Sequence, residues 1–380
     1  MRSARVPSVF LALLVALMAA GAVHAAEEAP FRSVEILPDG RVTFHYRDPK
    51  AATVEVNAPG NSKPLPMTRD SAGVWSATTS PLAPETYWYS FVVDGRAQLD
   101  PQNMSVAKNL VYLASLVTVP GRTLLLWDPA PVPHGELHHH FYTTSITKGL
   151  PGNQTDFFVY TPPGYDARAS RLYPVLFLLH GWSGTATDWV ENLGANFILD
   201  NLIAQGKAKP MVVVMPLGYD SVPLAPDGLR LKRSELQGDP SVVSDLILNE
   251  VFPRVVAEYR ISHDRKDRAV AGLSMGGSQS LFLGLAHPET FAWVGGFSSG
   301  VEGWKDYEGM FPGMDPKKAD FRLFWISCGT ADFLLPSNRR LSAWLTAKGF
   351  AVTEVETPGG HEGGVWRKNL IRFAQLVFQP

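Results

Sequence analysis

The sequence contains one cysteine, Cys328, among its 380 residues. A single cysteine cannot form an intramolecular disulfide, and no second thiol is present with which it could ligate a metal. Cys328 ends the apolar run "FRLFWISC", where a buried and unreactive thiol is expected. The fold must therefore be stabilised by its hydrophobic core, which a chain of this length can provide.

An excess of either charge is also lacking, because 34 basic and 36 acidic residues leave a formal net charge of −2. A balanced chain of this kind offers no basic surface that would favour a nucleic acid or an anionic membrane. We therefore expect no nucleic-acid partner.

Long apolar segments are absent except near the N-terminus, where Arg2 and Arg5 precede an apolar run over residues 9–20. The pattern "AVHA" then ends at Ala25 with small residues. A basic start, a short apolar stretch and a small-residue exit are typical of a secretory signal peptide. A membrane anchor is the alternative, but the run is short for a bilayer span. We predict a signal peptide over residues 1–25 and a mature chain that is exported to the periplasm or the medium, with no membrane association after cleavage.

Two composition patterns divide the rest of the chain. Residues 31–120 contain short alternating segments such as "RVTFHYR" and "TYWYSFVV", separated by turn residues, which favours a small β-sandwich. Residues 125–380 instead alternate apolar strands with helical patterns expected over 188–205, 242–259, 276–286 and 336–349. Strands such as "VLFLL" and "MVVVM" are apolar throughout, as strands buried on both faces are. This region is predicted to form an α/β fold with a mostly parallel sheet covered by helices.

The stretch "VAGLSMGGSQ" places Ser274 between Gly272 and Gly276, after a predicted strand and before a predicted helix. That context is the one required for a nucleophile elbow, in which a sharp turn presents a serine at the carboxyl edge of the sheet. Glycines on both sides would let the turn approach its neighbours closely. A purely structural glycine-rich turn is the alternative reading of this motif.

A nucleophilic serine needs a base and an acid, which follow it in the chain order of α/β-hydrolases. His361 lies on the glycine-rich loop "TPGGHEGG" after the last predicted strand, whereas His287 ends a helix and resembles a surface residue. Asp332 comes directly after an apolar strand, in "SCGTADF", and is the expected acid. The other acidic candidates lie on charged loops or within a strand: Asp306, Asp315, Asp320 and Glu356.

Further roles are expected in the same region. The backbone N–H groups of Met275 and Trp182 are the predicted oxyanion donors, and the N–H of Gly181 is the alternative to that of Trp182. His180 is expected to brace the loop "LLHGWSG". The indole rings that we expect to stack on substrate, although each could equally be core, are Trp182, Trp304 and Trp366. The aromatic residues of the N-terminal region that could line a glycan site or the sandwich core are Trp75, Tyr87 and Trp88.

A metal site is not favoured by this sequence. His138 and His140 would share one face of a strand, but no carboxylate or cysteine accompanies them at ligand spacing. Ester hydrolysis by a serine enzyme needs neither a metal nor a cofactor, and none is expected.

Five ordered motifs resemble carbohydrate esterase family 1, which includes feruloyl and acetyl xylan esterases and is related to enterochelin esterases: "YPVLFLLHGWSG", "DNLIAQGKAKPMVVVMPLGY", "AGLSMGGSQSLFLGLAHPETFAWVGGFS", "CGTADF" and "TPGGHEGGVWR". The resemblance spans about residues 125–380 and implies a serine esterase with Ser274, Asp332 and His361 as its triad. Residues 31–120 resemble the immunoglobulin-like early-set modules that precede such esterases. One departure is Gly363, because many of these esterases carry an aromatic residue soon after the histidine.

The implied substrates are feruloyl or acetyl esters on plant cell-wall polysaccharide such as xylan, or their oligosaccharides. Two alternatives remain open at this point. One is hydrolysis of a catecholate siderophore ester of the enterochelin type, and the other is a carbohydrate-binding protein whose hydrolase region is inert.

Overall fold

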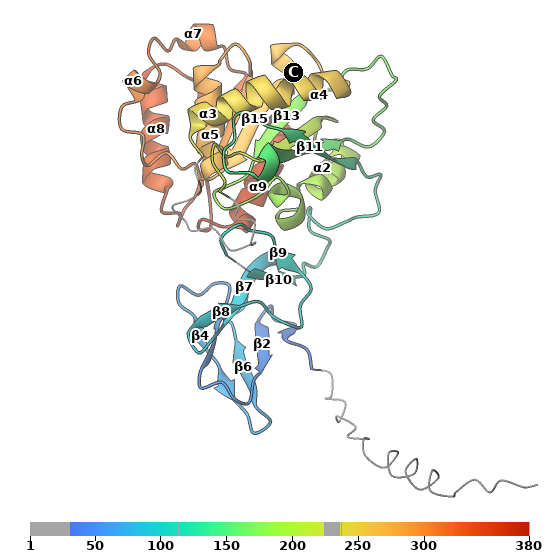
Figure 1. Cartoon of the computed structure of the whole chain (residues 1–380), viewed down its shortest axis with the longest axis vertical. Helices are drawn as coiled ribbons and strands as arrows, with labels where there is room; N and C mark the ends of the chain where they lie inside the picture. Colours follow the sequence, from blue (N-terminus) through green and yellow to red (C-terminus); the bar gives the residue numbers. More distant parts are fainter. Residues whose placement is uncertain (1–30, 113, 224–235, 237, 380) are drawn as a thin grey trace, which may run out of the picture.

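The computed structural model describes residues 31–112, 114–223, 236 and 238–379. The signal peptide predicted for residues 1–25 lies outside the described residues. In Figure 1 the N-terminal strands form a small all-β body below a larger α/β body, which is formed by the described residues that follow them. Within the described ranges, no helix combines the length and the apolar character that crossing a bilayer would require.

The N-terminal region folds into two antiparallel sheets, ordered β1-β2-β6-β5 and β4-β3-β7-β10-β9, with β8 paired to β7. Its strands are β1 (Val34–Ile36), β2 (Val42–Arg47), β3 (Val54–Asn57), β4 (Leu65–Pro66), β5 (Thr68–Arg69), β6 (Val74–Thr78), β7 (Glu85–Val93), β8 (Arg96–Gln98), β9 (Val106–Ala107) and β10 (Ala114–Val119). Alternate residues of both sheets, such as Phe44 and Phe91, share one buried core. The region is therefore all-β, as its alternating pattern predicted.

The α/β region is built on an eight-stranded sheet ordered β11-β12-β14-β13-β15-β16-β17-β18. Its strands are β11 (Glu136–Thr143), β12 (Gln154–Thr161), β13 (Val175–Leu179), β14 (Val212–Pro216), β15 (Arg268–Leu273), β16 (Trp293–Phe297), β17 (Leu323–Gly329) and β18 (Val352–Thr357). Pairings are antiparallel from β11 to β14 and parallel from β14 to β18. The carboxyl ends of the parallel strands consequently meet at one edge, where loops from several strands can converge.

Helices cover both faces of this sheet. The helical segments are η1 (Pro151–Asn153), η2 (Asp188–Asn192), α2 (Ala195–Ala204), α3 (Pro240–Asp245), η4 (Leu246–Val251), α4 (Phe252–Glu258), η5 (Arg265–Asp267), α5 (Met275–Ala286), α6 (Tyr307–Met310), α7 (Pro316–Ala319), α8 (Leu335–Ala347) and α9 (Gly363–Leu376). Phe177 points into the core covered by α3, α5 and α8, whereas Leu176 and Leu178 point into the core covered by α2 and α9. Burial on both faces explains why β13 is apolar at every position.

One helix expectation needs correction. The pattern predicted a single helix over 188–205, but the structure has a π-helical turn over Asp188–Asn192 and a separate helix over Ala195–Ala204. Gly194 separates them with a left-handed φ of 68°, a conformation that glycine adopts at little cost. Asp188 of the first segment lies near the carboxyl edge of the sheet, where it lines the cavity described below.

The two regions are joined by a buried contact between β7 and α9. Arg367 Nη1 donates to the Glu85 carboxylate at 2.6 Å and to the Thr86 carbonyl at 3.3 Å. Trp88 of β7 lies with its ring centroid 6.5 Å from that of Trp366 of α9. The N-terminal region therefore lies directly against the helix that begins two residues after His361.

Candidate active site

Ser274 occupies a sharp turn between β15 and α5. Its backbone has φ 53° and ψ −115°, a strained conformation for a residue with a side chain. A Cβ at Gly272 would lie 2.4 Å from the Gly276 carbonyl oxygen, and one at Gly276 would lie 2.4 Å from the His180 carbonyl oxygen. Only glycine fits at either position, so the turn can pack tightly between strand and helix. This is the geometry that a nucleophile elbow requires.

A chain of hydrogen bonds connects Ser274, His361 and Asp332. The distance from His361 Nε2 to Ser274 Oγ is 2.9 Å, and the distance from His361 Nδ1 to Asp332 Oδ2 is also 2.9 Å. Ser274 follows β15, Asp332 follows β17 and His361 follows β18, so three parallel strands present these residues at the same edge. The structure thus brings together the three side chains that the sequence singled out for nucleophilic catalysis.

Asp332 is held in an environment that favours its ionised form. Burial raises the pKa of this carboxyl, but the hydrogen bonds from His361 and from the Leu334 backbone N–H outweigh it, so the net pKa is lowered. A carboxylate so fixed can orient the imidazole and stabilise its protonated form. The alternative acids have other partners: Asp306 and Asp315 cap short helices, Asp320 ends α7 and Glu356 pairs with Arg339.

The loop after β13 lies against Ser274. A Cβ on Gly181 would lie 3.4 Å from the Ser274 Cβ, so the Gly181–Trp182 peptide borders the serine. Met275 is the first residue of α5, where backbone N–H groups have no acceptor within the helix and the helix dipole is positive. Gly181 therefore borders the serine side chain and Met275 follows it in the chain, and the donor roles of the Trp182 and Met275 N–H groups stay a prediction.

His180 braces this loop. Its Nε2 accepts from the Gly218 N–H at 2.9 Å, and its Nδ1 lies 2.7 Å from the Gly181 carbonyl oxygen. Burial lowers the pKa of His180 to about 4, with the bond to Gly181 opposing that shift. The imidazole is consequently neutral at physiological pH, donating from Nδ1 and accepting at Nε2, as a structural residue would.

A cavity of about 790 Å³ opens above Ser274 and His361. The three indole rings expected to contact substrate, Trp182, Trp304 and Trp366, all line it. Trp366 also packs edge-on to His361, with ring centroids 5.0 Å apart, and Trp304 packs against Phe282 and Phe311. Trp182 and Trp304 are half-buried in the wall of the site, whereas Trp366 is buried and reaches the wall from the core.

Three wall residues were not predicted from the sequence: Asn109 and Tyr112, which reach the cavity from the N-terminal region, and Phe333, which lies beside His361 with ring centroids 4.9 Å apart. Trp88, which was expected to line either a glycan site or the sandwich core, also reaches the cavity. Trp75, by contrast, is buried within the N-terminal core, and Tyr87 packs against that core. The position of Phe333 directly after the predicted acid Asp332 was the signal in the sequence that could have indicated its proximity to the site.

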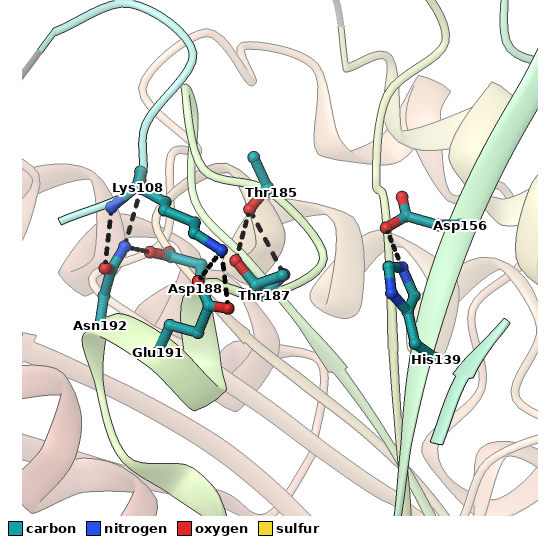
Figure 2. Close-up of polar contacts among 8 residues, drawn as sticks. All are labelled: Lys108, His139, Asp156, Thr185, Thr187, Asp188, Glu191 and Asn192. Carbon is teal, nitrogen blue, oxygen red and sulfur yellow. Dashed lines mark hydrogen bonds and ion pairs between the residues drawn. The ribbon is translucent and has the colours of Figure 1, made fainter. Parts of the chain in front are cut away.

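The histidines of β11 have local partners. His139 bonds to Asp156 at 2.7 Å, as Figure 2 shows, while His138 lies 3.3 Å from the Thr161 hydroxyl and His140 lies 2.5 Å from the Tyr259 hydroxyl. Over the residues that the structure describes, no group of three or more His, Cys, Asp or Glu side chains is arranged to hold a metal ion.

This sheet, with a serine turn and a cavity at its carboxyl edge, defines the chain as an enzyme of the α/β-hydrolase type. The family model described as "Putative esterase" matches residues 149–375, more than half of the chain. The chain belongs to this esterase family, in agreement with the resemblance of its motifs.

Similar proteins include an endo-1,4-beta-xylanase/feruloyl esterase of Xylanibacter ruminicola, which is 28% identical over 90% of this chain and 45% of that protein. The chain thus spans less than half of that relative. A ferulic acid esterase from the anaerobic fungus Anaeromyces mucronatus matches in structure with a TM-score of 0.55 and 22% identity, over 66% of this chain and 93% of its own. The enterobactin esterase of Shigella flexneri matches with a TM-score of 0.66 and 20% identity, over 91% of this chain and 96% of its own. The two structural likenesses establish the fold.

Proposed function

We propose that this chain is an exported serine esterase that hydrolyses feruloyl esters on plant cell-wall polysaccharide or its oligosaccharides. The observation that carries the proposal is the hydrogen-bonded chain from Ser274 through His361 to Asp332 at the floor of the cavity. The feruloyl ester is favoured over the acetyl ester by the size of the cavity and its indole walls, because an acetyl group would fill little of this space.

Acyl transfer would proceed in two halves. Ser274 Oγ attacks the ester carbonyl while His361 Nε2 takes its proton, and Asp332 stabilises the imidazolium through Nδ1. The N–H groups of Met275 and Trp182 stabilise the oxyanion, each contributing about 3 kcal/mol to lowering the barrier. His361 then protonates the leaving sugar alcohol, and a water molecule attacks the acyl-enzyme with the same histidine as base.

The organisation of the chain is part of this proposal. Residues 1–25 act as the export signal, residues 31–120 form an immunoglobulin-like early-set module, and residues 125–380 carry the chemistry. The polysaccharide assignment is supported by the Xylanibacter relative, which is named a xylanase/feruloyl esterase. Trp88 and Tyr112 of the N-terminal region, with ring centroids 6.2 Å apart, supply aromatic surface at the rim that suits a sugar.

Hydrolysis of a catecholate siderophore ester is the second candidate. It is favoured by one observation, the match of the Shigella enterobactin esterase to both regions of this chain. Both candidates share the same nucleophile and differ in the acyl group and in the leaving alcohol.

A rate comparison with the purified mature chain separates these candidates. The substrates are methyl ferulate, feruloylated arabinoxylan oligosaccharide, acetylated xylan and a catecholate trilactone. The proposal predicts the highest kcat/KM on the feruloylated oligosaccharide. The highest kcat/KM on the trilactone would support the second candidate, and activity on acetylated xylan alone would overturn the feruloyl assignment.

A further inference from the structure

Asp188 places a buried carboxylate in the wall of the active-site cavity. The residue is only 7% exposed, yet it lines the same cavity as Ser274 and Trp182. Its Oδ1 accepts from Asn192 Nδ2 at 2.6 Å, as Figure 2 shows, while no described residue donates to its Oδ2. A buried carboxylate normally accepts several hydrogen bonds, so the second oxygen has capacity for a donor that the described residues do not supply.

Neighbouring groups hold the carboxylate in this orientation. Asn192 is itself fixed, because its Oδ1 accepts from the Lys108 backbone N–H at 3.1 Å and its Nδ2 also donates to the Lys108 carbonyl at 2.9 Å. The Lys108 ammonium does not neutralise Asp188, since it pairs with Glu191 at 2.8 Å (Figure 2). The second oxygen faces Gly184, where a Cβ would lie 2.9 Å away. Glycine at this position therefore leaves Oδ2 uncovered.

The carboxylate lies on the side of Ser274 away from the base. The loop that carries it follows β13, which pairs with one edge of β15, whereas Asp332 and His361 follow β17 and β18 beyond the other edge. Gly184 donates to the Gly181 carbonyl at 3.1 Å, and Gly181 borders Ser274, so the loop connects the carboxylate closely to the serine. Since His361 must protonate the leaving alcohol, the leaving group lies on its side and the acyl group extends toward Asp188.

The charge of the Asp188 carboxylate determines which substrate groups could donate a hydrogen bond to it. Burial raises the pKa of Asp188 to about 6, although Asn192 and then Arg367 oppose that shift, so the group is mainly an ionised acceptor at neutral pH. An acetyl group has no hydrogen to donate to it. An aromatic acyl group with a phenolic hydroxyl has one, and the donor would satisfy a charge that is costly to leave unpaired in a buried site.

We infer that Asp188 is a specificity-determining residue, which accepts a hydrogen bond from a phenolic hydroxyl of the acyl group. This inference rests on the proposed function, because it assigns the end of the cavity that receives the ferulate ring. It predicts that the enzyme distinguishes a free phenol from its methyl ether at the same ring position.

The test compares methyl ferulate with methyl 3,4-dimethoxycinnamate, in which the phenolic hydroxyl is masked as a methyl ether. The wild-type chain is expected to show a kcat/KM at least about tenfold higher on methyl ferulate than on the methyl ether, because one hydrogen bond to a charged group contributes about that factor. In Asp188→Asn the side chain keeps its shape and its acceptor for Asn192 but loses its charge. The ratio between the two esters is expected to fall by about tenfold. Glu191→Gln, the same charge change on the same segment but outside the cavity wall, is the matched control and is expected to keep the wild-type ratio.

The outcomes separate this inference from the proposed function. A wild-type enzyme that hydrolyses both esters at equal kcat/KM overturns the role of Asp188 and leaves the feruloyl assignment standing. A variant in which both rates fall by the same factor also overturns it, because that result indicates a bracing role alone. A wild-type enzyme that hydrolyses neither cinnamate but does hydrolyse 4-nitrophenyl acetate contradicts the feruloyl assignment, and the inference with it.

Discussion

The carboxylate of Glu85 on β7 lies 2.6 Å from the guanidinium Nη1 of Arg367 on α9, and both side chains are buried. The same guanidinium donates to the Asn192 and Leu193 carbonyls, at the break between η2 and α2. A single arginine thus connects the N-terminal region, the segment that carries Asp188 and the helix that follows His361. Burial raises the pKa of Glu85 despite its cationic partner, which shows how costly the carboxylate would be without that partner.

Removal of this arginine should destabilise the chain strongly. In Arg367→Met the Glu85 carboxylate stays buried without its cation, so we expect the free energy of unfolding to fall by about 3–5 kcal/mol. Urea denaturation followed by circular dichroism measures the change. The double variant Glu85→Leu with Arg367→Met should recover part of the loss, because it leaves no unpaired charge. The exposed pair of Arg339 and Glu356 is the control, and Arg339→Met should cost about 0–1 kcal/mol. Equal losses in both arginine variants would contradict this account.

Gly276→Ala should lower activity through the serine turn. The added methyl would lie 2.4 Å from the His180 carbonyl and 2.5 Å from the Leu179 carbonyl, and neither backbone group can move without shifting β13. Displacing the elbow by a fraction of an ångström should reduce kcat/KM on methyl ferulate by at least about tenfold. For comparison, a methyl at Gly303 would meet no atom within 4 Å, and Gly303→Ala should leave the unfolding transition unchanged. Wild-type kcat/KM in Gly276→Ala would mean that the turn is less constrained than the structure indicates.

Asp332→Asn should abolish most of the activity without unfolding the chain. The asparagine amide presents a donor or a weaker acceptor to His361 Nδ1, so the imidazole loses both its orientation and the charge that stabilises its protonated form. We expect kcat to fall by about 10⁴-fold, as loss of this carboxylate does in serine hydrolases. Asp306→Asn, which alters the cap of α6 outside the site, should retain activity. If the two variants kept similar activity, Asp332 would not be the acid.

Cys328 should be inert in the native enzyme. Burial raises the pKa of this thiol to about 12, with the nearby Asp332 carboxylate adding to the shift, so the reactive thiolate is almost absent at pH 8. We expect no reaction with Ellman's reagent at pH 8 in the folded chain and one thiol per chain in 8 M urea. Because a raised pKa favours the neutral thiol, reactivity should rise only toward strongly alkaline pH. Rapid labelling of the folded chain at pH 8 would show that the thiol is exposed or ionised.

The side chains of the candidate triad could be predicted from the sequence because each of them lies in a recognisable local pattern. Ser274, Asp332 and His361 each follow a strand that is recognisable by its apolar run, and parallel strands bring their carboxyl ends together. The helix expected over 276–286 agrees with α5, and that over 242–259 agrees with the continuous run from α3 to α4. Local propensity and burial point the same way in these elements.

The walls of the cavity and the contact between the two regions were harder to predict from the sequence, because both depend on contacts between distant segments. Glu85 and Arg367 are 282 positions apart, and neither lies in a pattern that indicates its partner. Tyr87 and Tyr89 alternate with Trp88 along β7, so Trp88 points to the opposite face. All three are aromatic, however, and the pattern alone does not say which face meets the N-terminal core and which meets the cavity. Asp188 was expected to begin a long helix, and only the structure shows that it lies on a separate helical turn and lines the cavity.

The central claim is that Ser274 is the nucleophile that His361 activates. Diisopropyl fluorophosphate, a reagent that phosphorylates activated serines, should modify one residue per chain with complete loss of activity. Peptide mass spectrometry should locate the adduct on Ser274, and labelling should vanish in Ser274→Ala and slow by at least about 10³-fold in His361→Ala. An adduct on another serine, or undiminished ester hydrolysis by a folded Ser274→Ala chain, would contradict the account.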